Sequence, residues 1–277
     1  PLKPWDFARY AEKLRQAVYD FDEEALRPYF PLPRVIEGLF AICSRVFGIR
    51  VIETPGVPAW DAAVRYFEIR DASTAELLGA FYADFHAREN KRDGAWMDFL
   101  ITGGPGPGGH EPHLGLICAN LTRPVGNRPA LLTHEEVETI FHEFGHLLHQ
   151  CLSRAEMRGQ SGVNVACDFV ELPSQMMENW CWEREALDLI ASQYETGELL
   201  PEDLFAKMKR ARTFRAANGQ MRQLGLATLD LALHRQYSPE TDGDPVTYTR
   251  NIIQRFTPVQ LEPDHSMITG FMHLFSD

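Results

Sequence analysis

The chain has 277 residues, 44% of them hydrophobic and 11% aromatic, which is enough for a sizeable buried core. Its 27 basic and 39 acidic side chains give a net charge of −12 without a long run of one sign, so neither nucleic acid nor a membrane surface is an expected partner. No apolar stretch of about 18 residues predicts a membrane span. Five widely spaced cysteines without a C-x-x-C pair argue against a disulfide framework and favour a cytoplasmic location.

Two amphipathic helices are predicted in the first 48 residues. Within residues 5–26, Tyr10, Leu14 and Val18 recur at helical spacing, and residues 35–46 repeat this pattern. These helices form a lead-in to the rest of the chain.

The composition between residues 49 and 121 predicts a small β-sheet. Three short, apolar, β-prone segments are separated by polar or glycine-proline breaks, namely residues 64–69, 77–85 and 114–121. Residues 103–109 are rich in glycine, but two prolines remove backbone donors and no Lys-Ser/Thr pair follows. We therefore predict a surface loop there and not a phosphate-binding loop.

From residue 133 to residue 277 the sequence predicts helices. Thr133 and Glu136 form a capping box, after which an apolar stripe continues for about five turns. Further helices are predicted at residues 170–189, 202–213 and 219–236, with Pro173 tolerated because it lies near a helix start. The expected fold is α+β and predominantly α-helical, with one catalytic domain over residues 1–277.

The buried helix contains an H-E-x-x-H motif formed by His142, Glu143 and His146. Residues four apart on a helix share a face, so both imidazoles can bind one zinc ion. Glu143 is turned to one side of this pair, where its carboxylate can act as general base on a water. The pattern also occurs by chance, but two histidines and a carboxylate are costly to bury without a partner. A zincin-like active-site helix is therefore expected.

A catalytic zinc site needs a third protein ligand, and Glu171 is the candidate. It follows His146 by 25 residues, as expected for a helix that returns beside the first. The alternative is a surface glutamate at a helix N-terminus, where the helix dipole favours negative charge. His149 is a rival ligand, but it lies about 10 Å along the helix axis from His142 and is more consistent with packing or with supporting the site.

Histidines that bind zinc generally donate their other N–H to a carboxylate or a carbonyl group. Asp168 and Glu178, which flank Glu171 in the sequence, are available for this role. Glu178 is seven residues beyond Glu171 and so lies on the same helical face. A solvated surface charge remains the alternative for either residue.

Together these segments resemble the thimet oligopeptidase family of zinc peptidases, in particular its oligopeptidase A and dipeptidyl carboxypeptidase branch. The matching phrases cover nearly the whole chain and are residues 27–31, 38–40, 94–97, 132–134, 141–146, 169–175, 178–183 and 194–198. The resemblance implies one zinc ion per chain on His142, His146 and Glu171. It also implies that Glu143 is the catalytic acid-base and that short peptides are the substrates.

The ends of the sequence differ from the family pattern. The helical N-terminal portion of the family is absent, and so is the glycine- and tyrosine-rich loop that follows residues 271–275 in relatives. The chain is therefore expected to be truncated at both ends. Within residues 271–275, His273 resembles a histidine that faces the substrate, and an ordinary structural histidine is the alternative.

The predicted reaction is hydrolysis of peptide bonds in oligopeptides by a metal-activated water, with Glu143 as general base. One alternative is a chain that binds zinc but is inactive without the missing segments. An aminopeptidase is another, but no Gly-x-Met-Glu-Asn type of segment precedes the motif. The sequence does not indicate an oligomeric state.

Overall fold

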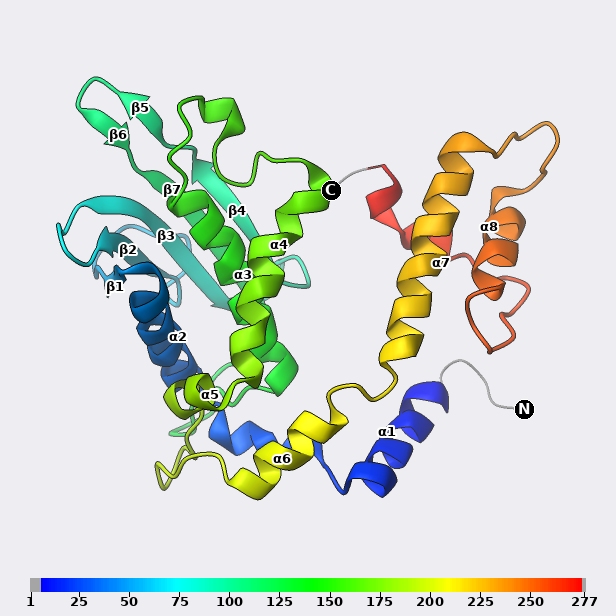
Figure 1. Ribbon diagram of the computed structural model, residues 1–277, viewed down its shortest axis with the longest axis horizontal. Helices are drawn as coiled ribbons and strands as arrows, with labels where there is room; N and C mark the ends of the chain where they lie inside the picture. Colours follow the sequence, from blue (N-terminus) through cyan, green and yellow to red (C-terminus); the bar gives the residue numbers. More distant parts are fainter. Residues whose placement is uncertain (1–5, 276–277) are drawn as a thin grey trace. The chain divides into compact units, whose positions relative to one another are not determined.

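The computed structural model describes residues 6–275, which fall into two compact units. The first unit comprises residues 22–205, and the described part of the second comprises residues 6–21 and 206–275. Figure 1 labels the helices and strands of both units. The prediction of a single catalytic domain over residues 1–277 stays a prediction.

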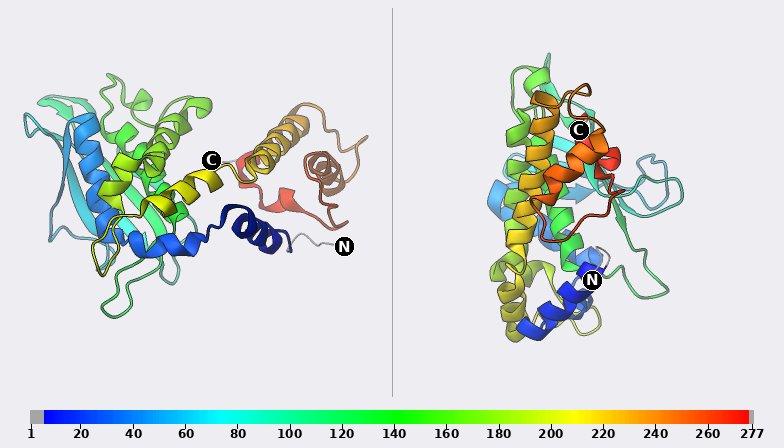
Figure 2. Two further views of the ribbon diagram at one scale, coloured as in Figure 1. Left: turned by 60° about the horizontal axis from the view of Figure 1, so that its bottom comes forward. Right: turned by 90° about the vertical axis from the view of Figure 1, so that its right-hand side faces the viewer.

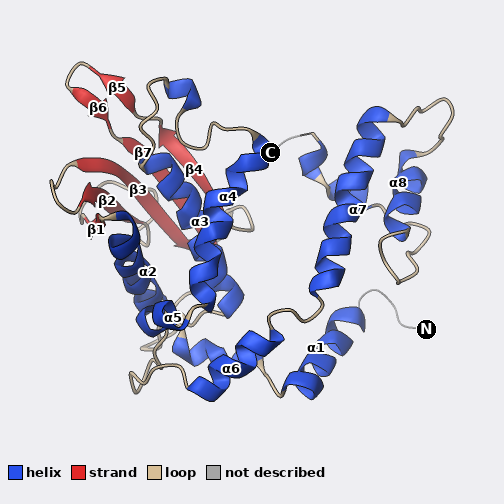
Figure 3. Ribbon diagram, in the orientation of Figure 1, coloured by secondary structure: helices blue, strands red, loops and turns tan. Residues whose placement is uncertain are grey.

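A five-stranded sheet in the first unit has the order β1-β2-β3-β7-β4, and its strands are coloured red in Figure 3. Only the pair β3–β7 is parallel, and the other three pairs are antiparallel. Strand β4 pairs with β7 alone and so forms one edge. The strands are β1 (Ile49–Glu53), β2 (Arg65–Asp71), β3 (Leu77–His86), β4 (Trp96–Ile101) and β7 (His113–Leu121).

Helices α2 (Leu32–Phe47) and α3 (His134–Cys151) cover one face of this sheet (Figure 2). Their aromatic side chains join those of the sheet: the Phe67 and Phe81 rings stack 5.0 Å apart, and Phe144 of α3 meets Phe81 edge-on at 5.7 Å. These three rings are at most 2% exposed, and burying such side chains supplies about 1.5–3 kcal/mol each. The core thus holds α3 firmly against the sheet.

Gly115 on β7 lets α3 approach the sheet closely. A Cβ atom at this position would lie 2.5 Å from Leu147 Cδ1, closer than side-chain carbons can pack. The absence of a side chain at Gly115 therefore lets α3 lie directly on β7.

The first unit also contains short helical segments that connect these layers. The chain passes through η1 (Glu23–Tyr29) before α2, and η2 (Arg158–Gln160), α4 (Cys167–Glu178), η3 (Asn179–Trp182) and α5 (Arg184–Ile190) follow α3. The mixture of helix and strand agrees with the expected α+β class. Helix α6 (Glu202–Ala211) contains the boundary between the two units.

The second unit is helical in its described part. It contains α1 (Asp6–Tyr19), α7 (Ala216–Arg235), α8 (Pro245–Gln254), η4 (Met267–Gly270) and η5 (Met272–Leu274). Helix α8 lies in the part of the chain that was expected to be helical, but its bounds were not predicted. Among the residues that the structure describes, no helix is both long and apolar enough to cross a membrane.

The first predicted helix is shorter than the sequence suggested. Helix α1 ends at Tyr19 because Asp20 adopts a left-handed backbone with φ of 48°, and Asp22 then caps η1. The prediction that one helix continues to residue 26 is therefore wrong. Residue 5, where that prediction began, lies outside the described residues.

Residues 103–109 do not form a plain loop. They contribute to a two-stranded hairpin in which β5 (Gly104–Gly106) pairs with β6 (Gly109–Glu111). Prolines occur on short edge strands because their missing N–H can face solvent, which is why Pro105 fits here. The loop prediction is corrected to a small hairpin.

The predicted helix over residues 170–189 is divided. Helix α4 begins earlier, at Cys167, and ends at Glu178, after which η3 and α5 follow. Pro173 is consequently the seventh residue of α4 and not part of its first turn. The reason given for tolerating this proline was wrong, since its missing N–H removes a hydrogen bond from the helix interior.

Candidate metal centre

Helix α3 presents its histidines from a well-defined start. The Thr133 hydroxyl accepts the N–H of Glu136, and the Glu136 carboxylate accepts the N–H of Thr133, which confirms the predicted capping box. Further along this helix, His142 and His146 lie one turn apart, and the centroids of their rings are 4.9 Å from each other. Both side chains are half-buried. The capped, buried helix fixes where these imidazoles point.

Gly145 brings α4 against this part of α3. A Cβ at Gly145 would lie 2.6 Å from the Ser174 Cα and 2.8 Å from the Pro173 carbonyl oxygen. These are backbone atoms, so they could not move away as a flexible side chain could. The contact places Glu171, one turn before Ser174 on α4, opposite the two histidines.

Three donor atoms meet where the helices touch. Glu171 Oε2 lies 3.1 Å from His142 Nε2 and 3.3 Å from His146 Nε2, and donor atoms of these residues all lie within 4.8 Å of one another. Ligand bonds of 2.0–2.2 Å around a tetrahedral zinc ion would separate donor atoms by about 3.3–3.6 Å. The two distances from Glu171 are close to this range, and imidazole nitrogens and carboxylate oxygens are ligand types that zinc accepts.

His142 lies between two carboxylates. Its Nδ1 is 2.7 Å from Glu178 Oε1, and its Nε2 is 3.1 Å from Glu171 Oε2. When the ring donates its Nδ1 proton to Glu178, the lone pair on Nε2 is free to bind a cation held together with Glu171. Glu178 thus contacts one of the three candidate ligands, and its role in orienting that ligand stays a prediction.

Glu143 lies beside the histidines and is only 8% exposed. Burial raises the pKa of its carboxyl group, the nearby His142 lowers it, and the carboxylate of Glu171 raises it again. The backbone of Met97, on edge strand β4, lowers the pKa of Glu143 and so favours the ionised form. A raised pKa is what a group that accepts and returns a proton requires.

Burial also affects His146. The loss of water around its ring lowers the pKa of His146, although the Glu171 carboxylate acts in the opposite direction. A lowered pKa keeps the ring neutral, and only a neutral imidazole can bind a metal ion.

Two groups at the centre were not singled out from the sequence. The Ser174 hydroxyl donates to Glu171 Oε2 at 2.8 Å and so restrains the candidate ligand. Its position three residues after Glu171 could have indicated this contact, because residues i and i+3 are neighbours on a helix. The effect of the Met97 backbone on Glu143 had no such signal, since β4 was not predicted.

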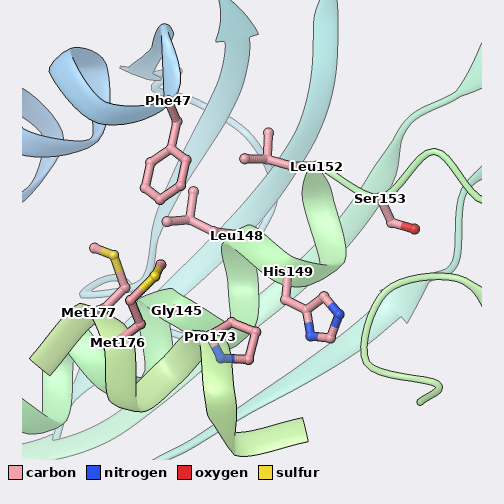
Figure 4. Close-up of a pocket in the computed structure, with 9 residues that line it drawn as sticks. All are labelled: Phe47, Gly145, Leu148, His149, Leu152, Ser153, Pro173, Met176 and Met177. Atoms are coloured by element: carbon pink, nitrogen blue, oxygen red, sulfur yellow. The ribbon is translucent and has the colours of Figure 1, made fainter. Parts of the chain in front are cut away.

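Three further residues were predicted to take part in the site, and the structure brings none of them into the group of three donors. Asp168 is exposed and, within the described residues, makes no hydrogen bond to either histidine. His149 lines a separate cavity of about 290 Å³ with Pro173 and Met176 (Figure 4). His273 is exposed on η5 in the second unit, with its ring 5.9 Å from that of Phe271. The roles expected for these three residues stay predictions.

Comparison with known proteins identifies the class. Residues 1–277 match the model of peptidase family M3, and the chain belongs to that family. Over 99% of its length it is 44% identical to oligopeptidase A of Escherichia coli (strain K12) and 46% identical to oligopeptidase A of Haemophilus influenzae. It is also 38% identical to the dipeptidyl carboxypeptidase of Escherichia coli over 99% of the chain. The chain spans about 40% of the length of these relatives.

Proposed function

We propose that this chain is the zinc-binding catalytic region of a peptidase that hydrolyses short peptides. His142, His146 and Glu171 hold one zinc ion, and Glu143 is the general base. The observation that carries the proposal is the convergence of three donor atoms within 4.8 Å beside a buried glutamate. The names of the relatives, oligopeptidase A and dipeptidyl carboxypeptidase, support a peptide substrate and a zincin-like site.

Bound zinc supplies Lewis acidity, which polarises the scissile carbonyl and lowers the pKa of water to near neutrality. Glu143 accepts the proton of the attacking water and then returns it to the leaving amine. Glu178 holds the His142 ring through its Nδ1–H, and Ser174 holds the carboxylate of Glu171. These residues orient the ligands and do not exchange protons with the substrate.

The peptide lies along β4 in this proposal. Strand β4 is an edge strand whose outer backbone groups have no partner strand among the described residues. Strand β4 packs against α3, the helix that carries Glu143, so a peptide added to this edge passes the proposed general base. Backbone hydrogen bonds to an exposed edge are a common way to bind an extended peptide without strict sequence preference.

The second candidate is a chain that binds zinc but needs the remainder of a longer protein for turnover. We keep this candidate because the chain spans only about 40% of the length of the relatives. Both candidates bind peptides. A cytoplasmic location is also proposed, because one relative, from Arabidopsis thaliana, is named a probable cytosolic oligopeptidase A.

The test is the Glu143→Gln variant, assayed for bound zinc and for cleavage of an internally quenched peptide beside the parent chain. The proposal predicts one zinc per chain in both proteins, turnover in the parent, and a loss of about 10³-fold or more in the variant. Zinc without turnover in the parent supports the second candidate. Substantial turnover in the variant contradicts the assignment of Glu143.

A further inference from the structure

Three charged side chains meet at the end of β3, away from the metal centre. Asp84 is 3% exposed. Its carboxylate accepts hydrogen bonds from Arg88 at 2.6 and 2.7 Å, from Lys91 at 2.9 Å and from the Trp60 indole at 2.9 Å. A buried carboxylate is stable only when it is paired and hydrogen-bonded in this way.

Lys91 is the other buried member of the cluster, with a side chain that is 3% exposed. Besides the Asp84 carboxylate, its ammonium donates to the carbonyl oxygens of Asp84, His86 and Ala119. Ala119 lies on β7, whereas Asp84 and His86 lie on β3. Lys91 therefore attaches the connection between β3 and β4 to the ends of β3 and β7.

Asn120, at the end of β7, fastens the rest of this connection. Its side-chain amide donates at 2.8 Å to the carbonyl oxygens of both Arg92 and Gly94. Strand β4 begins two residues after Gly94, and there Trp96 pairs with Cys118. Lys91 and Asn120 thus hold the connection that leads directly into the edge strand β4.

The start of β4 is also where the strand meets the site. Strand β4 packs against α3, the helix that carries Glu143, and the backbone of Met97, the second residue of β4, is one of the groups that lower the pKa of Glu143. Small displacements at such a point matter, because a shift of about 1 Å caused by a distant change can cost about 10²-fold in turnover.

We propose that Lys91 and Asn120 are positioning residues that hold the start of β4 in place beside the helix that carries Glu143. They thereby set the affinity for extended peptides. This inference rests on the proposed function, because it assumes that peptides lie along β4. It assigns a role at the site to two side chains that do not touch the metal ligands. Their substitution should weaken binding of long ligands and spare ligands that reach only the zinc.

The test compares two zinc-directed inhibitors on the zinc-loaded chain: acetohydroxamate, which is too small to reach β4, and an extended phosphinic peptide. The variants are Lys91→Met and Asn120→Asp, the second of which keeps the size of the side chain but removes both N–H donors. Arg65→Met is the matched control, since it removes a cation that bridges β1 and β2 in the same sheet. Zinc content is measured for every protein.

The proposal predicts that both variants keep zinc and bind acetohydroxamate within about twofold of the parent, but bind the phosphinic peptide about 10- to 100-fold more weakly. Arg65→Met should bind both ligands as the parent does. Unchanged peptide affinity in Asn120→Asp, or equal losses for both ligands, would overturn it, and Asn120→Asp suffices if Lys91→Met does not fold. A parent chain that binds neither inhibitor contradicts the proposed function instead.

Discussion

Glu178 Oε1 lies 2.7 Å from His142 Nδ1, and this contact determines which ring nitrogen faces Glu171. A neutral His142 ring that donates its Nδ1 proton to Glu178 presents an unprotonated Nε2 to the place where three donor atoms converge. Carboxylate partners of this kind fix the tautomer of a metal-binding histidine and raise its basicity. The zinc affinity of the chain should therefore depend on a residue that is not itself a ligand.

Replacing Glu178 with Ala should weaken zinc binding by about 10- to 100-fold, because His142 loses the group that orients it and fixes its proton. The dissociation constant is measured by competition with a chromophoric chelator at constant pH. Asp168→Asn is the control, since Asp168 flanks the same ligand but contacts neither histidine within the described residues. Equal zinc affinity in Glu178→Ala and the parent would contradict the role of Glu178.

Gly145→Ala should both destabilise the chain and weaken zinc binding. The added methyl group would lie 2.6 Å from the Ser174 Cα, so α4 must move away and carry Glu171 with it. Overpacking of this kind costs about 1–3 kcal/mol, which urea unfolding of the metal-free chain measures.

Gly159→Ala serves as the control for Gly145→Ala, because no atom lies within 4 Å of its added Cβ. It should leave stability and zinc affinity close to those of the parent. If Gly145→Ala also retained both, α4 would not depend on close contact at this glycine.

Asp84 should make the stability of the chain depend on pH in the acid range. Burial opposes ionisation of Asp84, but hydrogen bonds from Arg88, Lys91 and Trp60 outweigh it and lower its pKa to about 2. The unfolded chain has a pKa of about 3.9 at this group. The contribution, about 2.6 kcal/mol, is therefore complete above about pH 5 and is lost as the pH falls through about 2.

The measurement is urea unfolding of the metal-free parent and of Asp84→Asn at several pH values. The parent should be more stable than the variant near pH 6, and the difference should shrink steadily as the pH approaches 2. A difference that stays constant over this range would show that the charge on Asp84 does not stabilise the fold.

The local features of the site could be predicted from the sequence. The capping box at Thr133 and the spacing of His142 and His146 depend on residues within five turns of one helix, where the geometry is regular. The position of Glu178 also followed from helical spacing, because it lies seven residues after Glu171. Each of these inferences needed only one helix at a time.

Other features depend on contacts between distant segments. Strands β1 and β4 were not predicted; β4 pairs with β7, about 20 residues away, and contains Asp98 and exposed apolar residues that give no clear alternation. The close approach of α4 to α3 depends on Gly145, whose importance appears only when the neighbouring backbone is known. The apolar residues Tyr10, Leu14 and Val18 of α1 are all at least 52% exposed, although their spacing suggested a buried face.

The most direct test of the central claim is an anomalous difference map, measured at the zinc absorption edge from crystals of the zinc-loaded chain. One strong peak per chain is expected, about 2.0–2.2 Å from His142 Nε2, His146 Nε2 and a carboxylate oxygen of Glu171. The same peak should persist in Glu143→Gln, because that residue is not a ligand. A zinc peak at other residues, or no peak between α3 and α4, would contradict the account.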